Sequence, residues 1–160
     1  MPGVRRLNHA VLYVADAEQS ADFYVRVLGF TIAHQFPGAV FLRADAAHND
    51  HDLGLFSIGG RASAAGRPGI GLYHLAWQVD TIDELAALRG RLFEAGSLIG
   101  ESDHGVSKSL YARDLDGIEF EVMWAVPRAV WDGTVGTARL DLGAELARWA
   151  ATPTLAELNV

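Results

Sequence analysis

Three residues stand at places where their side chains could bind one metal ion. His9 in LNHAVLYV and His74 in LYHLAWQV occupy matching positions, each in the middle of an apolar strand-like run. Taken singly, such a histidine is usually an ordinary core residue. Glu121 lies in the apolar run GIEFEVMW, and a buried carboxylate has to be paired or bound to metal. Two neutral imidazoles and one carboxylate form a facial triad, which suits non-heme Fe(II), with Mn(II) as a variant.

The matching histidines belong to an internal repeat. Residues 7–30 and 72–96 each give an alternating apolar run, typical of a strand, followed by a helical pattern. Asp16 and Thr81 stand where helix N-caps are expected, and both predicted helices end at a glycine. We expect these helices to bury two sets of residues, namely Ala21, Tyr24, Val27 and Leu28, and Ile82, Leu85, Leu88 and Leu92. If the two halves pair with pseudo-twofold symmetry, the two histidines converge.

Three short strand-like runs follow each predicted helix, so each half has the pattern βαβββ. We therefore predict one domain, residues 1–126, made of two modules at about 5–58 and 70–126. The Gly-, Ala-, Ser- and Pro-rich residues 59–69 link the modules. Residues 127–160 form a C-terminal tail, in which RLDLGAELARWA predicts a short amphipathic helix packed on the outside or on a partner chain.

Composition excludes several classes of function. The 160 residues are half hydrophobic and carry a net charge of −7, which disfavours nucleic acid as a partner. No cysteine is present, so disulfides and thiolate metal sites are excluded. The N-terminus is a poor signal peptide, and no run approaches the ~18 apolar residues of a membrane span. We expect a cytoplasmic protein with no membrane partner.

Paired βαβββ modules with ligands on their first and last strands resemble the vicinal oxygen chelate superfamily. This superfamily includes glyoxalases, bleomycin- and fosfomycin-resistance proteins, an epimerase and extradiol catechol dioxygenases. The resemblance covers about residues 5–127. It implies an α+β fold in which two tandem βαβββ modules form a half-open β-barrel around a metal site, here His9, His74 and Glu121. The fold hosts several reactions, so it does not by itself decide the function.

The residue at the superfamily's fourth metal-coordination position narrows the choice among the superfamily's reactions. It lies on the last strand of the first module, where glyoxalase I enzymes usually place a carboxylate. This chain has the apolar run Leu53, Gly54, Leu55 and Phe56 there. We therefore expect three protein ligands, as in extradiol and fosfomycin enzymes, and more open positions for substrate oxygens.

Three further residues resemble the extradiol dioxygenases in particular. His51 precedes the strand HDLGLF, and His104 leads a loop that ends at Tyr111, ten residues before Glu121. The loop is shorter than in the larger two-repeat enzymes. By this resemblance His51 is the acid–base catalyst, because a histidine titrates near neutral pH. His104 and Tyr111 would hydrogen-bond the metal-bound substrate oxygen.

The leading hypothesis is an Fe(II)-dependent extradiol dioxygenase that cleaves a catechol-type aromatic substrate with O2. The alternatives are a glyoxalase-like or thiol-transferase metalloenzyme and a non-catalytic antibiotic-binding protein of the same fold. We expect an apolar pocket to which Phe56, Trp77 and Met123 contribute. We also expect a homo-oligomer, since Trp131 and Trp149 in the tail offer apolar surface. His34 and His48 receive no role.

Overall fold

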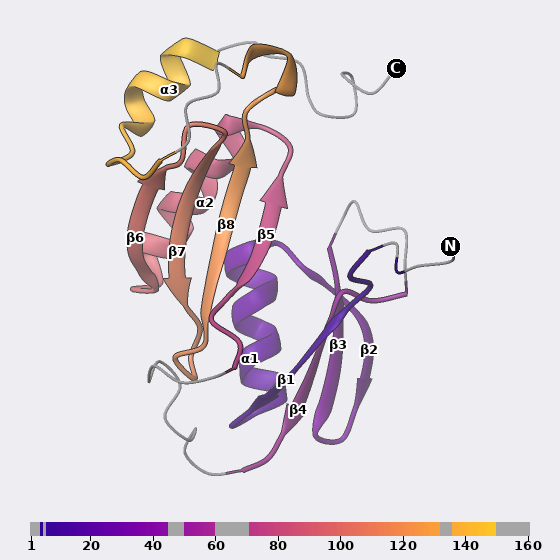
Figure 1. The fold of residues 1–160 in the computed structure, drawn as a ribbon. Helices are drawn as coiled ribbons and strands as arrows, with labels where there is room; N and C mark the ends of the chain where they lie inside the picture. Colours follow the sequence, from indigo (N-terminus) through magenta and orange to yellow (C-terminus); the bar gives the residue numbers. More distant parts are fainter. Residues whose placement is uncertain (1–3, 5, 45–49, 60–70, 132–135, 150–160) are drawn as a thin grey trace. The chain divides into compact units, whose positions relative to one another are not determined.

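The computed structural model describes residues 4, 6–44, 50–59, 71–131 and 136–149 (Figure 1). The chain divides into two compact units, Met1–Ala65 and Gly66–Val160. The predicted linker, apart from Gly59, lies outside the described residues, and so does His48. The division into one two-module domain and a separate tail stays a prediction.

The first unit has the order βαβββ. Its elements are β1 (Ala10–Val14), α1 (Ala17–Phe23), a π-helical turn (Tyr24–Leu28), β2 (Thr31–Phe36), β3 (Ala39–Arg43) and β4 (Leu53–Ser57). The sheet order is β1-β4-β3-β2, with β1 parallel to β4 and the other pairs antiparallel.

The second unit repeats this plan and adds the tail. It contains β5 (Leu75–Val79), α2 (Ile82–Glu94), β6 (Leu98–Asp103), β7 (Ser107–Arg113) and β8 (Glu119–Ala125). Its sheet order, β5-β8-β7-β6, matches that of the first unit, again with one parallel pair, β5 and β8. A 3-10 turn (Arg128–Val130) and α3 (Leu142–Trp149) follow. The predicted α+β fold with two βαβββ modules is confirmed, and each unit's sheet is open, not a closed barrel.

The predicted helix signals act as expected. The Asp16 carboxylate accepts hydrogen bonds from the backbone N–H groups of Glu18 and Gln19 at 3.0 and 3.1 Å. Thr81 and Glu84 form a reciprocal capping box at the start of α2. Gly29 and Gly96, with φ of 81° and 66°, follow the two helices in the left-handed conformation that glycine adopts without strain.

One face of each sheet is covered by its helix. The predicted face of α2 is buried, and the predicted face of α1 is buried except for the half-buried Leu28. On β8 the alternation also holds, because Phe120, Val122 and Trp124 are buried while Glu119, Glu121 and Met123 are only partly so. A functional site on either sheet would therefore lie on the face that the helix leaves uncovered.

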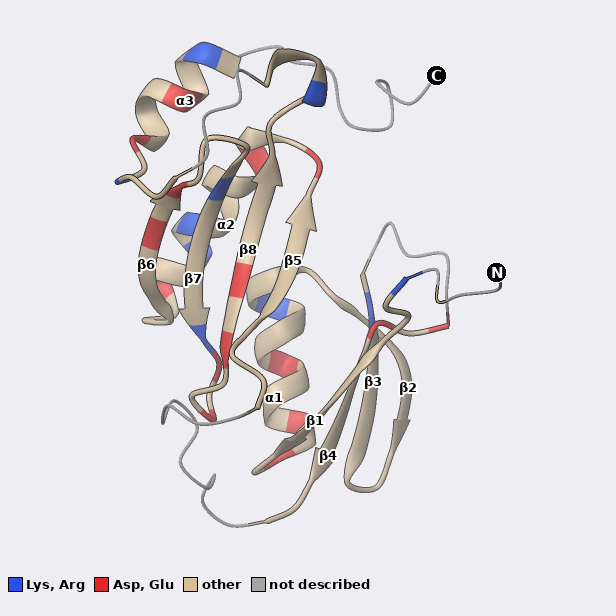
Figure 2. Cartoon of the chain, in the orientation of Figure 1, with Lys and Arg blue, Asp and Glu red and all other residues tan. Residues whose placement is uncertain are grey.

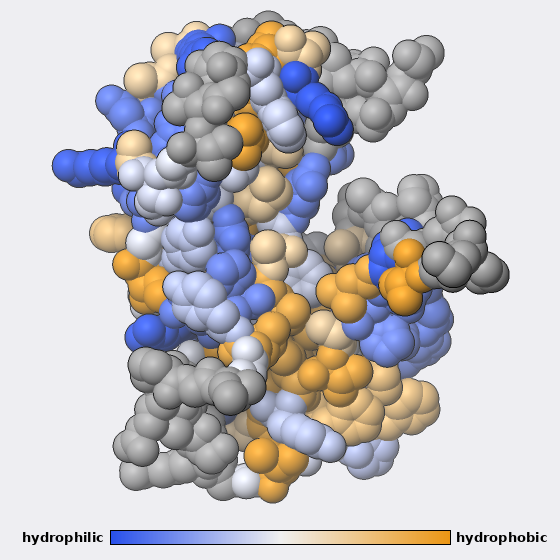
Figure 3. Space-filling model, in the orientation of Figure 1, coloured by the Kyte–Doolittle hydropathy of each residue, from blue (hydrophilic) through white to orange (hydrophobic). Residues whose placement is uncertain are grey.

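Large hydrophobic side chains stay exposed on the strands of the first unit. Val11 is 51% exposed and Phe36 57% exposed, and hydrophobic residues gather over this unit in the space-filling view (Figure 3). Each lies on the sheet face that α1 leaves uncovered, since alternate residues of a strand point to opposite faces. This face therefore offers an apolar surface to a ligand or to other protein.

The packing of α2 predicts a local stability effect. Leu85 is fully buried, so Leu85→Ala should lower the free energy of unfolding of the second unit by about 2–5 kcal/mol. All four tryptophans lie in this unit, so urea denaturation followed by tryptophan fluorescence reports on it. The matched control is Leu115→Ala, because Leu115 is 60% exposed and should change the free energy by less than about 0.5 kcal/mol. Equal effects of the two substitutions would contradict the assigned core.

Candidate functional site

The uncovered face of the second sheet gathers polar side chains from its strands and from the residues that flank them. Tyr111 pairs with Glu121 across β7 and β8, so both side chains point to the same face. Their neighbours Leu110 and Val122 are buried on the α2 side. Acidic residues are visible along β8 (Figure 2).

His74 lies beside Glu121 on this face. Its Nε2 atom is 3.1 Å from Oε2 of Glu121, and the two side chains are 22% and 13% exposed. His74 immediately precedes β5, although the sequence predicted a position within the strand. The regular pairing of β5 with β8 begins only at Leu75, opposite Phe120. His74 therefore lies just outside the sheet, at the N-terminal end of β5.

The two neighbouring carboxylates on β8 have different partners. Glu119 is 3.4 Å from Nη2 of Arg113, so a cation already compensates its charge. Among the described residues no lysine or arginine lies within ion-pair distance of Glu121. A carboxylate this far from water requires a hydrogen-bond donor or a cation, so Glu121 is the better metal ligand of the two.

The His74–Glu121 pair has the spacing of two adjacent ligands. Ligands bound at about 2.1 Å and at right angles to each other are separated by about 3.0 Å, close to the observed 3.1 Å. His74 Nδ1 is buried and has no hydrogen-bond partner among the described residues. Within either unit by itself, the described residues hold no group of three His, Asp or Glu side chains suited to a metal. His74 and Glu121 are therefore spaced as two adjacent ligands of one metal ion would be.

Tyr111 and His104 extend the polar cluster. The Tyr111 hydroxyl and His104 Nε2 are 3.0 Å apart, and the rings of Tyr111 and His74 lie 5.7 Å apart. Burial, followed by the negative charge of Glu121, raises the pKa of Tyr111 above its ordinary value. Tyr111 is therefore a neutral phenol at physiological pH and can donate its proton in a hydrogen bond.

In the first unit His9 and His51 stand together. Their ring centroids are 4.7 Å apart, because each histidine comes just before one of the parallel strands β1 and β4. The sequence placed His9 within the strand, but the ladder begins at Ala10, which pairs with Leu53. His9 Nδ1 lies 2.9 Å from the side-chain oxygen of Asn8. Donation from Nδ1 to this oxygen leaves Nε2 as the lone-pair nitrogen of a neutral imidazole, the form that binds metals.

Asp50 holds His51 in place. Its two carboxylate oxygens lie 2.9 Å from His51 Nδ1 and 2.9 Å from His34 Nε2. The hydrogen bonds from His34 and then from His51 lower the pKa of Asp50, so it stays ionised and accepts from His51. No role for His34 was expected from the sequence, and its contact with Asp50 depends on the pairing of β2, β3 and β4.

Aromatic side chains surround His51. The ring of Phe41 is 5.0 Å from that of His51 and 5.6 Å from that of Phe56, in edge-to-face contacts. Gly54 lies among them, and a Cβ added there would come within 3.4 Å of both Phe41 and Val11. The fourth coordination position thus holds only glycine and phenylalanine on the uncovered face, since Leu53 and Leu55 are buried.

Of the three residues expected to line an apolar pocket, two lie on an uncovered sheet face and one does not. Phe56 and Met123 lie on the uncovered faces of their sheets. Trp77 pairs with Val122, so it points to the α2 side, and the prediction that it lines the substrate pocket is wrong. Strand alternation decides this, because His74 and Trp77 are three residues apart and cannot share a face.

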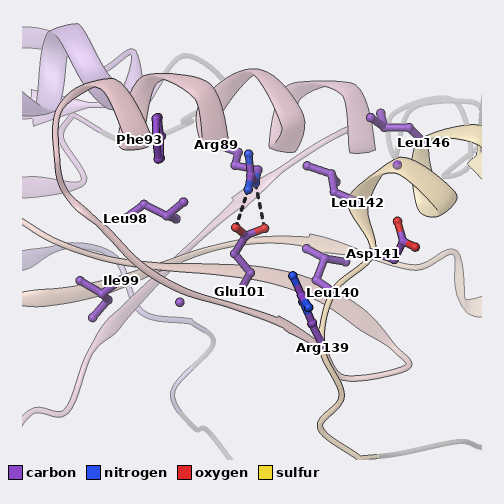
Figure 4. A pocket seen from close by; sticks show the side chains of 12 residues that line it. Arg89, Phe93, Leu98, Ile99, Glu101, Arg139, Leu140, Asp141, Leu142 and Leu146 are labelled. Carbon is purple, nitrogen blue, oxygen red and sulfur yellow. Dashed lines mark hydrogen bonds and ion pairs between the residues drawn. The ribbon is translucent and has the colours of Figure 1, made fainter.

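A cavity in the second unit lies away from the His74–Glu121 cluster. It measures about 1020 Å³ and lies among α2, β6 and the tail. Arg89 of α2 and Glu101 of β6 line it and face each other in a two-bond ion pair (Figure 4). Glu101 pairs with Leu110, and thus points to the face opposite Tyr111 and Glu121. The cavity is therefore not part of the His74–Glu121 cluster.

Comparison with known proteins agrees with this architecture. Residues 6–122 match the profile of the Glyoxalase/Bleomycin resistance protein/Dioxygenase superfamily. The catechol-2,3-dioxygenase of Bacillus subtilis strain 168 is 33% identical over 128 residues, which are 78% of this chain and 43% of that protein. The biphenyl-2,3-diol 1,2-dioxygenase 3 of Rhodococcus globerulus is 33% identical over 117 residues, or 70% of this chain and 59% of that protein. The chain thus spans about half the length of these curated relatives.

A solved structure has the same fold. The glyoxylase/bleomycin resistance protein/dioxygenase domain from Frankia sp. EAN1pec aligns with a TM-score of 0.60 and 24% identity, covering 78% of this chain and all of that one. In the part of the chain that the structure describes, no helix is long and apolar enough to cross a membrane. On the match over residues 6–122, this chain belongs to the Glyoxalase/Bleomycin resistance protein/Dioxygenase superfamily.

Proposed function

We propose that the protein is an Fe(II)-dependent extradiol dioxygenase, which cleaves the ring of a catechol-type substrate with O2. The observation that carries the proposal is the cluster of His74, Glu121, Tyr111 and His104 on one sheet face. It combines two adjacent metal ligands with a phenol–imidazole pair. The names of the Bacillus and Rhodococcus relatives support the same reaction class.

His9, His74 and Glu121 are the proposed ligands. Two neutral imidazoles and one carboxylate suit Fe(II), and Mn(II) is the alternative. When bound, the metal would bring the catechol oxygens and O2 together and mediate electron transfer between them. Gly54 and Phe56 leave room for these oxygens, because neither supplies a fourth protein ligand.

His51 is the proposed acid–base catalyst. Asp50 accepts a hydrogen bond from Nδ1, so the lone pair of the neutral ring is on Nε2. This nitrogen can take a proton from a catechol hydroxyl and later return it to an oxygen of the substrate. The Asp50 carboxylate stabilises the imidazolium that exists in the meantime, and His34 fixes the carboxylate.

Tyr111 and His104 are proposed to act together on the metal-bound substrate oxygen: Tyr111 hydrogen-bonds it, and His104 supports the Tyr111 hydroxyl. Burial and the charge of Glu121 raise the pKa of Tyr111, so its hydroxyl keeps a proton to donate. A neutral donor next to Glu121 can hold a negatively charged oxygen there without adding another negative charge. The phenylalanines around His51 provide edge-to-face contacts for an aromatic ring.

Reconstitution tests the function. Protein loaded with Fe(II) without oxygen and then mixed with catechols in air should consume O2 and form coloured ring-opened products. Glu121→Gln should lose iron and activity, while Glu119→Gln, two residues away on the same face, should retain both. Absence of oxygen uptake with all catechols tested would contradict the proposal. So would oxygen-independent activity on a glyoxalase or thiol-transferase substrate with Ni, Zn or Mn.

His51 can be tested separately from metal binding. His51→Asn should lower kcat by roughly 10²–10⁴-fold, because the general base is lost. Iron content measured on the same sample should stay at the level of the unmodified protein. Asp50→Asn should give a smaller loss, since it removes the charge that orients His51 but leaves the imidazole in place. Unchanged turnover of His51→Asn with iron retained would remove His51 from the mechanism.

A further inference from the structure

We propose that the C-terminal segment 136–149 is a functional part of the site, because its backbone fixes the proton of His104 on Nδ1. The tautomer assignment stands on the geometry alone. Its catalytic consequence rests on the proposed function. The sequence placed this tail outside the two modules and gave it no part in the chemistry.

The Gly136 carbonyl determines the tautomer. This oxygen lies 3.2 Å from His104 Nδ1, and a carbonyl oxygen only accepts hydrogen bonds. Nδ1 therefore carries a proton in both the neutral and the charged ring. In the neutral ring Nε2 is then an acceptor, and the Tyr111 hydroxyl donates to it over 3.0 Å. The Thr137 hydroxyl, 3.3 Å from Nδ1, can both donate and accept, so it does not select a tautomer.

An antiparallel bridge holds the Gly136 carbonyl in register. Asp103 N–H donates to the Ala138 carbonyl at 2.9 Å, and Ala138 N–H donates to the Asp103 carbonyl at 2.8 Å. These bonds join the tail to the end of β6 at the residue directly before His104. The position of the tail backbone is therefore coupled to the position of the imidazole.

A buried ion pair anchors α3 to the same place. Lys108 is 3% exposed, and its ammonium group lies 2.6 Å from Asp103 and 3.4 Å from Glu145 of α3. Burial acts to raise the pKa of Asp103, but the hydrogen bonds from Lys108 and from the Gly105 N–H, together with the charge of Lys108, outweigh it, and the pKa is lowered. Trp149 also packs against Trp124, with ring centroids 5.4 Å apart. Trp149 thus packs inside its own unit. The homo-oligomer expected from the sequence stays a prediction.

The fixed tautomer makes Tyr111 and His104 a proton acceptor pair. A substrate hydroxyl can give its proton to the Tyr111 oxygen while the Tyr111 proton moves to His104 Nε2. Tyr111 ends neutral, and His104 becomes an imidazolium that donates through Nδ1 to Gly136. The substrate oxygen then carries the charge and accepts a hydrogen bond from Tyr111. With the opposite tautomer, Nε2 would already hold a proton and could not accept this one.

The tautomer can be measured on metal-free protein. Long-range ¹H–¹⁵N spectra distinguish the two ring nitrogens, and His104→Gln assigns the resonances. We expect neutral His104 to carry its proton on Nδ1. A proton on Nε2 would overturn the inference. Because this measurement needs neither iron nor a catechol, its outcome is separate from that of the proposed reaction.

Ala138→Pro tests the role of the tail in the full-length protein. Proline removes the N–H that Ala138 donates to Asp103 and so weakens the bridge. We expect a mixture of His104 tautomers and a loss of about tenfold or more in kcat, as for other residues that orient a site. The pH dependence of kcat should also shift, which a purely structural role would not cause.

Thr137→Val is the matched control, since it removes only the hydroxyl and keeps the Gly136 carbonyl. It should leave the tautomer and the pH profile unchanged. A tautomer that changes in Thr137→Val and not in Ala138→Pro would overturn the role of the carbonyl. If Ala138→Pro does not fold, Glu145→Gln replaces it, because it removes the charge that Lys108 contacts on α3 and keeps a side-chain oxygen that can accept from Trp149. Unchanged tautomer and pH profile in a folded tail variant would likewise count against the inference.

Discussion

The account depends on one electrostatic constraint, the partly buried carboxylate of Glu121. Its side chain is 13% exposed and lies 3.1 Å from His74 Nε2. Removing a carboxylate from water is costly unless a donor or a cation compensates its charge. The strand pattern of β8 leaves no alternative position, because the residues on either side are committed to the core beneath α2. A metal ion bound with His74 would satisfy this charge more fully than a neutral imidazole does.

The surrounding residues control protons in a consistent way. In the first unit Asp50 determines which nitrogen of His51 has the lone pair. In the second unit Gly136 does the same for His104 through a backbone carbonyl. One histidine is thus oriented by a charge and the other by a neutral dipole.

Local signals in the sequence predicted much of the fold. Alternation, helix caps and the repeat predicted both βαβββ modules, since these depend on neighbouring residues. The same repeat pointed to His9 and His74. Contacts between distant residues were not predictable in this way. The His34–Asp50 pair depends on strand register, and the Gly136–His104 contact depends on where the tail crosses β6. Trp77 was misplaced because strand alternation puts it on the face opposite Glu121, opposite Val122 in the ladder.

Iron K-edge anomalous diffraction from Fe(II)-loaded crystals grown without oxygen tests the central claim most directly. The account predicts one iron peak, with His9 Nε2, His74 Nε2 and a Glu121 carboxylate oxygen each about 2.0–2.2 Å from it. The remaining positions should hold solvent or substrate oxygens. An iron bound by other side chains, or coordinated by a fourth protein carboxylate, would contradict the proposed site.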